Sequence, residues 1–327
     1  MRRRRFLAGM ASALASPAGI AQTKSAPRRI AFLFYASQQA AYATGRYQAF
    51  VDGLREAGWI EGRDVEIHAR YADGDGARVI AMVDEALREN VDVIVATGSP
   101  VYRALLDAKV RAPVVVTVGP DPVGYGLAKS IARPGGRFTG LTDAADSLVP
   151  KQVELMRAAV PRLASIGTMI NPTNESHPPQ AKRLAAIASD AGLKFASSEA
   201  STAAAIPDAL AALAKAQARA VVLFGDTFYT QVFATIASSA IERRLATIYI
   251  VPQFADAGGL MSYGPDLTDN FRRAARFVDR VLKGAQPGDL PFEHPSTYQL
   301  VINLRTAKAL GLALPSSLTA RADRVIE

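Results

Sequence analysis

The 327-residue sequence contains no cysteine. A chain without cysteine forms no disulfide bond and cannot carry a lipid anchor attached to an amino-terminal cysteine. Its stability must therefore come from a packed interior. Because 49% of the residues are hydrophobic, the chain has ample material for such a core.

Sequence patterns typical of catalysis are also missing. The three histidines, His68, His177 and His294, are scattered and lack the spacing of a metal site. There is no G-x-S-x-G nucleophile elbow, no P-loop and no G-x-G-x-x-G after a strand. We expect His177 to have a surface or capping role. The sequence thus predicts a protein that is not an enzyme, with no catalytic residue, no metal and no cofactor.

Outside the amino terminus, the chain has only a small excess of basic over acidic residues. The full chain has 38 Lys and Arg against 30 Asp and Glu, but four of these arginines form one cluster at residues 2–5. Without that cluster, 34 basic residues face 30 acidic ones, a net charge of +4. No basic run remains in the rest of the chain, so nucleic-acid binding is not predicted.

The first 21 residues have the order of a secretory signal. A basic cluster precedes a short apolar run at residues 7–15, and small residues follow at positions 19 and 21. That run is about half the roughly 20 residues that a membrane span needs. The letters RRRFL at residues 3–7 resemble the twin-arginine export motif, with an ordinary Sec signal as the alternative. We predict a cleaved signal at residues 1–21 and, without an anchor, a soluble protein in the periplasm.

Apolar runs alternate with helical segments along the rest of the chain. This alternation predicts parallel sheets covered by helices on both faces. In the first half, strands are predicted at 30–35, 65–71, 91–96 and 114–118, and helices at 42–57, 77–89 and 100–109. In the second half, helices are predicted at 147–160, 180–191, 206–216 and 229–243, and strands at 165–170, 193–196, 220–224 and 247–251. The sequence therefore indicates two doubly wound α/β lobes around a cleft.

Short polar loops follow most of the predicted strands. In open α/β sheets, ligands bind beyond the carboxyl ends of the strands, where helix N-termini can meet an anion. The same residue types also cap helices wherever the chain turns, so a structural role stays open for each one. The candidate ligand-binding residues are Ser37, Gln38, Gly98, Ser99, Asp121, Pro122, Thr173, Asn174, Asp226, Phe228, Tyr229 and Phe254.

Five stretches, taken in order, resemble the family of ABC transporter substrate-binding proteins whose characterised members bind tryptophan or related aromatic amino acids. The resemblance extends from about residue 28 to the end of the chain. The stretches are GLREAGWIEGRDV at 53–65, DPVG at 121–124, ARPGGRFTG at 132–140, AGGLMSYGP at 257–265 and LVINLRTAKALG at 300–311.

This resemblance implies the type 1 periplasmic-binding fold, with two Rossmann-like lobes joined by three crossings. The crossings are expected near residues 141–147, 263–265 and 286–295. One lobe would then comprise residues 28–143 with 265–287, and the other residues 144–264 with 288–327. The resemblance also implies a monomer that delivers a small molecule to an ABC permease in the inner membrane.

The predicted cleft loops carry aromatic residues and no arginine, which favours a ligand with an aromatic or apolar part. Helix N-termini and hydroxyls would hold a ligand carboxylate, while Asp121 or Asp226 would suit an ammonium group. We predict the periplasmic component of an ABC importer, which captures a small organic solute by lobe closure. An aromatic amino acid or aromatic acid is the expected solute. A sensory solute-binding protein for a membrane receptor and an exported α/β enzyme remain alternatives.

Overall fold

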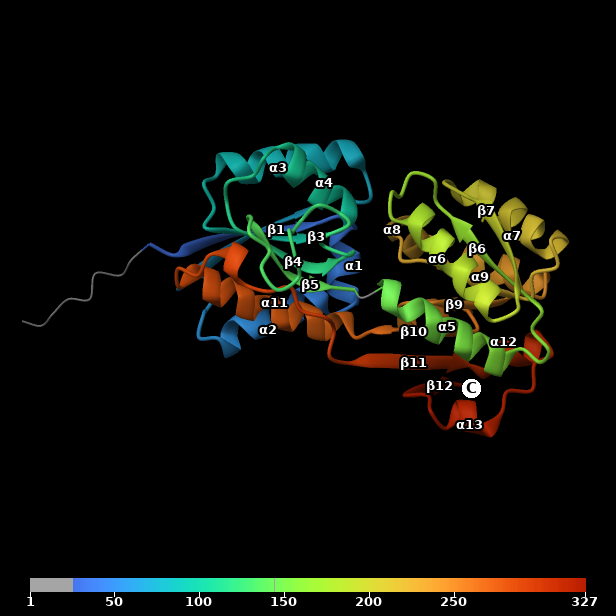
Figure 1. Ribbon diagram of the computed structural model, residues 1–327. Coiled ribbons are helices and arrows are strands. Elements are labelled where there is room, and N and C mark those ends of the chain that lie inside the picture. Colours follow the sequence, from blue (N-terminus) through green and yellow to red (C-terminus); the bar gives the residue numbers. More distant parts are fainter. Residues whose placement is uncertain (1–25, 144) are drawn as a thin grey trace, which may run out of the picture.

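The computed structural model describes residues 26–143 and 145–327, which form two α/β lobes (Figure 1). The predicted signal at residues 1–21 lies outside the described residues. Within the described ranges, no helix combines the length and the apolar character needed to cross a membrane.

The first lobe is built on a parallel five-stranded sheet in the order β2-β1-β3-β4-β5. Its inner strands β1, β3 and β4 have nearly continuous apolar sequences because helices cover both faces of the sheet. The strands are β1 (Arg28–Phe34), β2 (Val65–Tyr71), β3 (Val93–Thr97), β4 (Val114–Gly119) and β5 (Phe138–Thr142). The helices are α1 (Gln38–Ala43), α2 (Arg46–Glu56), α3 (Gly76–Arg88), α4 (Ser99–Asp107) and the later α11 (Leu267–Leu282).

The second lobe has a seven-stranded sheet in the order β12-β11-β10-β9-β8-β6-β7, in which only the β10–β11 pair is antiparallel. Its strands are β6 (Ser165–Ile170), β7 (Lys194–Glu199), β8 (Ala220–Val222), β9 (Ala246–Tyr249), β10 (Met261–Pro265), β11 (Tyr298–Asn303) and β12 (Arg324–Ile326). Its helices are α5 (Ala145–Ala159), α6 (His177–Asp190), α7 (Ile206–Lys215), α8 (Thr227–Gln231), α9 (Phe233–Glu242), α10 (Pro252–Asp256), α12 (Leu304–Ala309) and α13 (Ser316–Thr319). Two short 3-10 turns, η1 (Ala203–Ala205) and η2 (Pro287–Asp289), complete the elements.

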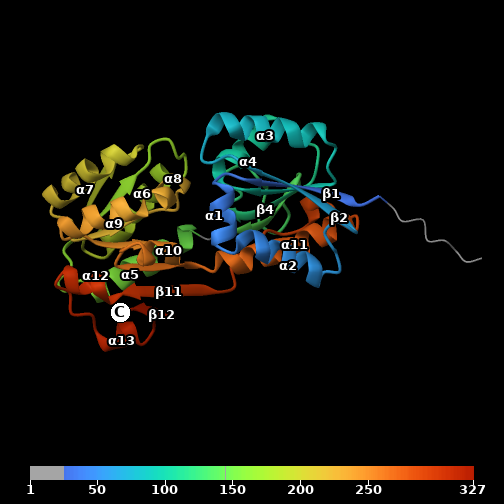
Figure 2. The same cartoon turned by 180° about the vertical axis from the view of Figure 1, so that it is seen from behind.

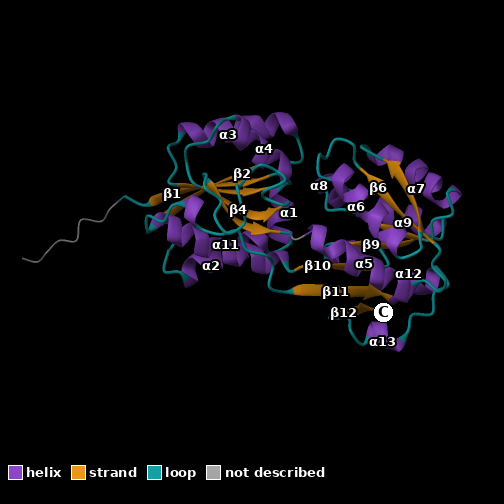
Figure 3. Ribbon diagram, in the orientation of Figure 1, coloured by secondary structure: helices purple, strands orange, loops and turns teal. Residues whose placement is uncertain are grey.

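The chain passes between the two sheets three times, as Figures 2 and 3 show. It first crosses from β5 into α5. It then leaves β10 for α11, which packs on α2 and on strands β3, β4 and β5 of the first lobe. Residues 287–293 stay on that lobe, where the Thr142 amide donates to the Glu293 carbonyl at 3.0 Å, before the chain returns to β11. The type 1 periplasmic-binding fold with two doubly wound lobes is thus confirmed, while the exact lobe boundaries stay a prediction.

The sequence of helix α11 explains why this segment, which lies far along the chain from β1–β5, packs on the first lobe. Its buried residues include Phe271, Ala274, Val278 and Val281, spaced three or four apart so that they form one apolar stripe. The Asp266 side chain caps its N-terminus by accepting from the amides of the first turn. The stripe joins the apolar cluster that also contains side chains of β1, β3 and α2.

Two predicted helices are each broken in two. The predicted helix at 42–57 is replaced by α1 and α2, because Gly45 adopts a left-handed φ of 69° and turns the chain between them. The predicted helix at 229–243 is interrupted at Val232, between α8 and α9. The first break makes Arg46 the first residue of α2, and this arginine lines the cavity described below.

Several short elements have no counterpart among the predicted ones, notably strands β5, β10, β11 and β12. Strand β10 has the sequence MSYGP, and its Gly and Pro indicated a crossing rather than a strand. The structure shows both features, since β10 pairs with β9 and β11 and then leads into the crossing. Gly264 is required there, because a Cβ atom at this position would collide with the Ile250 carbonyl oxygen.

Candidate ligand-binding site

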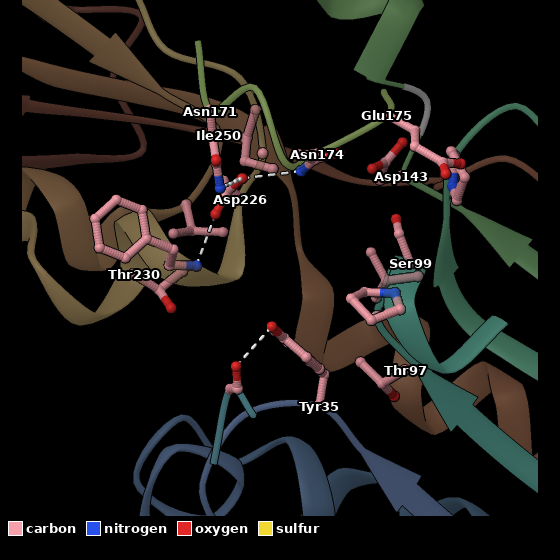
Figure 4. A pocket seen from close by; sticks show the side chains of 18 of the residues that line it. Tyr35, Thr97, Ser99, Asp143, Asn171, Asn174, Glu175, Asp226, Thr230 and Ile250 are labelled. Atoms are coloured by element: carbon pink, nitrogen blue, oxygen red, sulfur yellow. Dashed lines mark hydrogen bonds between the residues drawn. The ribbon is translucent and has the colours of Figure 1, made fainter. Parts of the chain in front are cut away.

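A cavity of about 520 Å³ lies between the lobes, at the carboxyl ends of strands from both sheets (Figure 4). This is where open parallel sheets place their ligands, since the strand-to-helix loops converge there. The first lobe contributes Tyr35, Arg46, Gly74, Thr97, Gly98, Ser99, Pro100, Arg103, Val118, Pro120 and Tyr125, and the segments that join the lobes contribute Asp143 and Leu267. The second lobe contributes Asn171, Thr173, Asn174, Glu175, Ser201, Gly225, Asp226, Phe228, Thr230, Tyr249, Ile250 and Val251.

Half of the twelve predicted binding residues line this cavity. They are Gly98, Ser99, Thr173, Asn174, Asp226 and Phe228. The six that lie outside the lining are Ser37, Gln38, Asp121, Pro122, Tyr229 and Phe254. Contact with a ligand stays a prediction for all twelve residues.

Local structure accounts for four of the six residues outside the lining. The Ser37 hydroxyl accepts from the Ala40 amide and caps α1, and the Asp121 carboxylate closes its own loop by accepting from two backbone amides. Tyr229 and Phe254 are fully buried and pack within the second lobe. Capping and core packing, which compete with ligand binding for the same residue types, therefore hold these side chains.

Asp226 organises the second-lobe wall of the cavity. Its Oδ1 accepts from the Phe228 and Tyr229 amides at 2.7 and 3.4 Å, which caps α8. Its Oδ2 accepts from the side-chain amides of Asn171 and Asn174 at 3.1 and 2.9 Å. A carboxylate has about four acceptor sites, so these four hydrogen bonds occupy its capacity. Asp226 therefore ties the loop after β6 to the loop after β8.

His177 lies behind this wall and does not line the cavity. Its Nδ1 accepts from the Asn171 amide at 2.8 Å, and its Nε2 donates to the Gly225 carbonyl at 3.3 Å. Burial lowers the pKa of His177 below its usual value, and the neighbouring Asp226 carboxylate only partly opposes that shift. The ring is fully buried and neutral at pH 7, so the expected surface position is wrong. The ring supports the Asn171 loop from within.

Two arginines line the cavity although the predicted loops contain none. Both belong to helices, which a search confined to loops overlooks. Arg103, on α4, extends from the first lobe to the second, where its Nη2 lies 3.0 Å from the Glu175 Oε2. The same guanidinium lies over the Tyr125 ring, 5.0 Å from its centroid. Arg103 thus forms a contact between the lobes at the edge of the cavity.

Arg46 is the first residue of α2, directly after the left-handed Gly45. Its side chain is partly buried in the cavity lining, and it forms no hydrogen bond or ion pair with any residue of the described ranges. Burial lowers the pKa of Arg46 to about 10, and the Tyr249 phenol opposes that shift. The guanidinium therefore stays charged at neutral pH.

Aromatic and apolar side chains form the rest of the lining. The Tyr35 hydroxyl donates to the Gly74 carbonyl at 2.7 Å, and the Tyr125 hydroxyl donates to the Ser99 carbonyl at 2.8 Å. These hydrogen bonds fix two rings on the first lobe, while Phe228 stands on the second. The described part of the chain holds no group of His, Asp and Glu side chains arranged to bind a metal. The arrangement suits a small organic solute with both polar and aromatic parts.

Two α/β lobes around a polar and aromatic cavity are the architecture of the type 1 periplasmic-binding fold. A model of the ABC transporter substrate binding protein family matches residues 29–326. The chain therefore belongs to that family, whose members are substrate-binding proteins rather than enzymes.

Several proteins are similar to this chain, and two of those described next have a stated ligand. The tyrosine-binding protein of Clostridioides difficile (strain R20291) is 24% identical over 267 residues, which cover 81% of this chain and 76% of that protein. The crystal structure of an ABC domain in complex with L-Trp from Streptococcus pneumonia matches 92% of this chain and 100% of its own, with a TM-score of 0.84 and 27% identity. A conserved domain protein from Vibrio cholerae O1 biovar El Tor N16961 matches the same shares, with a TM-score of 0.85 and 27% identity.

Proposed function

We propose that this protein is the periplasmic substrate-capturing component of an ABC importer and that its ligand is an aromatic amino acid or a related aromatic acid. The observation that carries the proposal is the cavity of about 520 Å³ that both lobes line at the carboxyl ends of their strands. Its size lies in the range of small-molecule sites, about 300–1,000 Å³. The aromatic rings of Tyr35, Tyr125 and Phe228 supply matching surface.

The relatives support the ligand class. One related protein is named as tyrosine-binding, and one similar structure holds L-Trp. Both ligands are α-amino acids with an aromatic side chain. A site with charged groups beside aromatic rings is what such a ligand requires.

Capture by closure follows from the division of the lining between the lobes. A ligand that contacts both lobes favours the closed form by its extra contacts there, because it shifts the equilibrium only through differential affinity. The closed form would then dock on a permease in the inner membrane. The signal-like residues 1–21 support export to the periplasm, where we expect a soluble monomer.

Thermal unfolding in the presence of candidate solutes tests the ligand class. Protein from Gln22 onward is first unfolded and refolded to remove any carried-over ligand. A ligand at a hundred times its dissociation constant stabilises by about 2.7 kcal/mol. For lobes of this size that corresponds to a rise of roughly 5 to 10 °C. We expect this rise with an aromatic amino acid or aromatic acid, and none with nucleosides. A rise only with branched amino acids or nucleosides would refute the aromatic assignment.

Uptake by whole cells tests the importer role separately. Cells that lack the protein should take up the identified solute more slowly, and plasmid-borne wild-type protein should restore the rate. If uptake is unchanged but a response to the solute is lost, the protein serves a membrane receptor instead.

A further inference from the structure

Arg46 carries a charge that no residue of the described ranges pairs with. Arginines elsewhere on the same helix and in the same cavity have partners: Arg55 pairs with Asp52, and Arg103 pairs with Glu175. Arg46 has none within the described ranges, although its side chain is partly buried between the lobes. A partly desolvated charge without a partner is costly, and a bound anion would offset that cost.

The charges of the cavity lining indicate which kind of anionic ligand would suit Arg46. Among the described residues, five charged side chains line the cavity: Arg46, Arg103, Asp143, Glu175 and Asp226. The lining as a whole therefore carries two positive and three negative charges, of which Arg103 and Glu175 pair with each other. A simple carboxylic acid bound at Arg46 would add to the negative excess. A zwitterion would match Arg46 and leave that balance unchanged.

The opposite charges line the same cavity as the Tyr249 hydroxyl group. The Tyr249 hydroxyl is held by the backbone of Asp226, to whose carbonyl it donates at 3.0 Å. Burial is the main cause that raises the pKa of Tyr249, but the charges of Asp226, Arg46 and Asp143 also act on it. Because Arg46, Asp143, Asp226 and Tyr249 all line this cavity, a small ligand inside it would face a cation from the first lobe and two carboxylates.

We propose that Arg46 binds the carboxylate of the ligand and that the cavity thereby selects zwitterionic α-amino acids over analogues that lack either charge. This inference rests on the proposed capture of a small solute and names its charge type. The planar guanidinium can form two parallel hydrogen bonds with a carboxylate, a geometry that lysine cannot reproduce. The contact between Arg46 of the first lobe and a ligand bound against the second lobe would then favour the closed form.

Calorimetry with matched ligands tests the proposal on the refolded protein. The set comprises L-tyrosine, L-tryptophan and a branched amino acid, then L-tyrosinamide, which lacks the carboxylate, and 3-(4-hydroxyphenyl)propionate, which lacks the ammonium group. We expect the wild-type protein to bind the aromatic amino acid at least tenfold more tightly than either analogue. An amide that binds as tightly as the amino acid would overturn the proposal without any variant.

The variant Arg46→Gln should bind the amino acid roughly 10- to 100-fold more weakly, the effect of losing hydrogen bonds between charged groups. Its affinity for L-tyrosinamide should stay within about twofold of wild type. Arg46→Lys should fall between wild type and Arg46→Gln. Arg55→Gln, on the same helix but exposed and paired with Asp52, is the matched control and should bind as wild type does.

The outcomes separate this inference from the proposed function. Suppose that the wild type binds an aromatic amino acid. If Arg46→Gln binds it equally well, only the Arg46 assignment fails. The same conclusion holds if Arg46→Gln loses as much affinity for L-tyrosinamide as for the amino acid. If only the branched amino acid binds and Arg46→Gln loses it, the aromatic assignment fails and the carboxylate assignment stands. If no solute with a carboxylate binds, both fail.

Discussion

Removal of the Asp226 carboxylate is the sharpest test of how the cavity wall is held together. In Asp226→Ala, the two amides of the α8 cap and the side-chain amides of Asn171 and Asn174 all lose their acceptor. Asn174 is partly exposed and can turn to water, but Asn171 and the Tyr229 amide are buried.

The expected loss of stability follows from these contacts. A lost N-cap costs about 1 kcal/mol, and each buried donor left without an acceptor costs about 1–3 kcal/mol. Relief from burying the Asp226 charge offsets part of this sum. We therefore expect Asp226→Ala to lower the free energy of unfolding by about 2–4 kcal/mol. Asp226→Asn keeps one acceptor oxygen but sets an amide donor against two others, so we expect a smaller loss of about 1–2 kcal/mol.

Urea unfolding of the ligand-free protein, followed by circular dichroism, measures these changes. The control is Asp256→Asn, which removes a carboxylate from an exposed pair with Arg324 and should change stability by less than about 0.5 kcal/mol. If Asp226→Ala were as stable as this control, the carboxylate would not hold the two loops together.

Three further predictions follow from other contacts of the site and its frame. Changing Arg103 and Glu175 singly and together should show a coupling of about 0.2–1 kcal/mol in ligand affinity; zero coupling would show that the pair does not favour closure. Because the pKa of His177 is lowered by burial, the unfolded chain binds the proton more readily, and stability should fall as the pH drops below about 6.5. His177→Gln should flatten that part of the pH profile of unfolding, and an unchanged profile would assign the pH dependence to other groups. Gly264→Ala should destabilise by about 1–3 kcal/mol in thermal unfolding, because its methyl group meets the main chain, whereas Gly76→Ala has open space and should not.

Sequence periodicity predicted the elements that have long apolar patterns. Helix α3 was expected at 77–89 and lies at Gly76–Arg88, because its buried residues recur three or four positions apart and form one apolar stripe. Strands such as β6, predicted at 165–170, coincide with the structure for a similar reason. Short strands were missed where Gly and Pro make the local sequence look like a turn, as in β10.

The polar loops of the site were predicted as a group and not one by one. A hydroxyl or carboxylate after a strand satisfies either a helix N-terminus or a ligand, and the local sequence is the same in both cases. Only the packed structure shows that Ser37 caps α1 away from the cavity while Ser99 lines it.

The sequence by itself determined the class of fold, the alternation of the longer strands and helices, and the edge of each sheet at which the polar loops gather. These properties follow from apolar periodicity and chain direction, which are local. The tertiary structure alone decided which charges meet at the cavity. Arg46 and Asp143 are nearly a hundred positions apart in the sequence and face one space only because the chain crosses between the lobes there. Charge complementarity depends on distances through space, and no local pattern in the sequence records those distances.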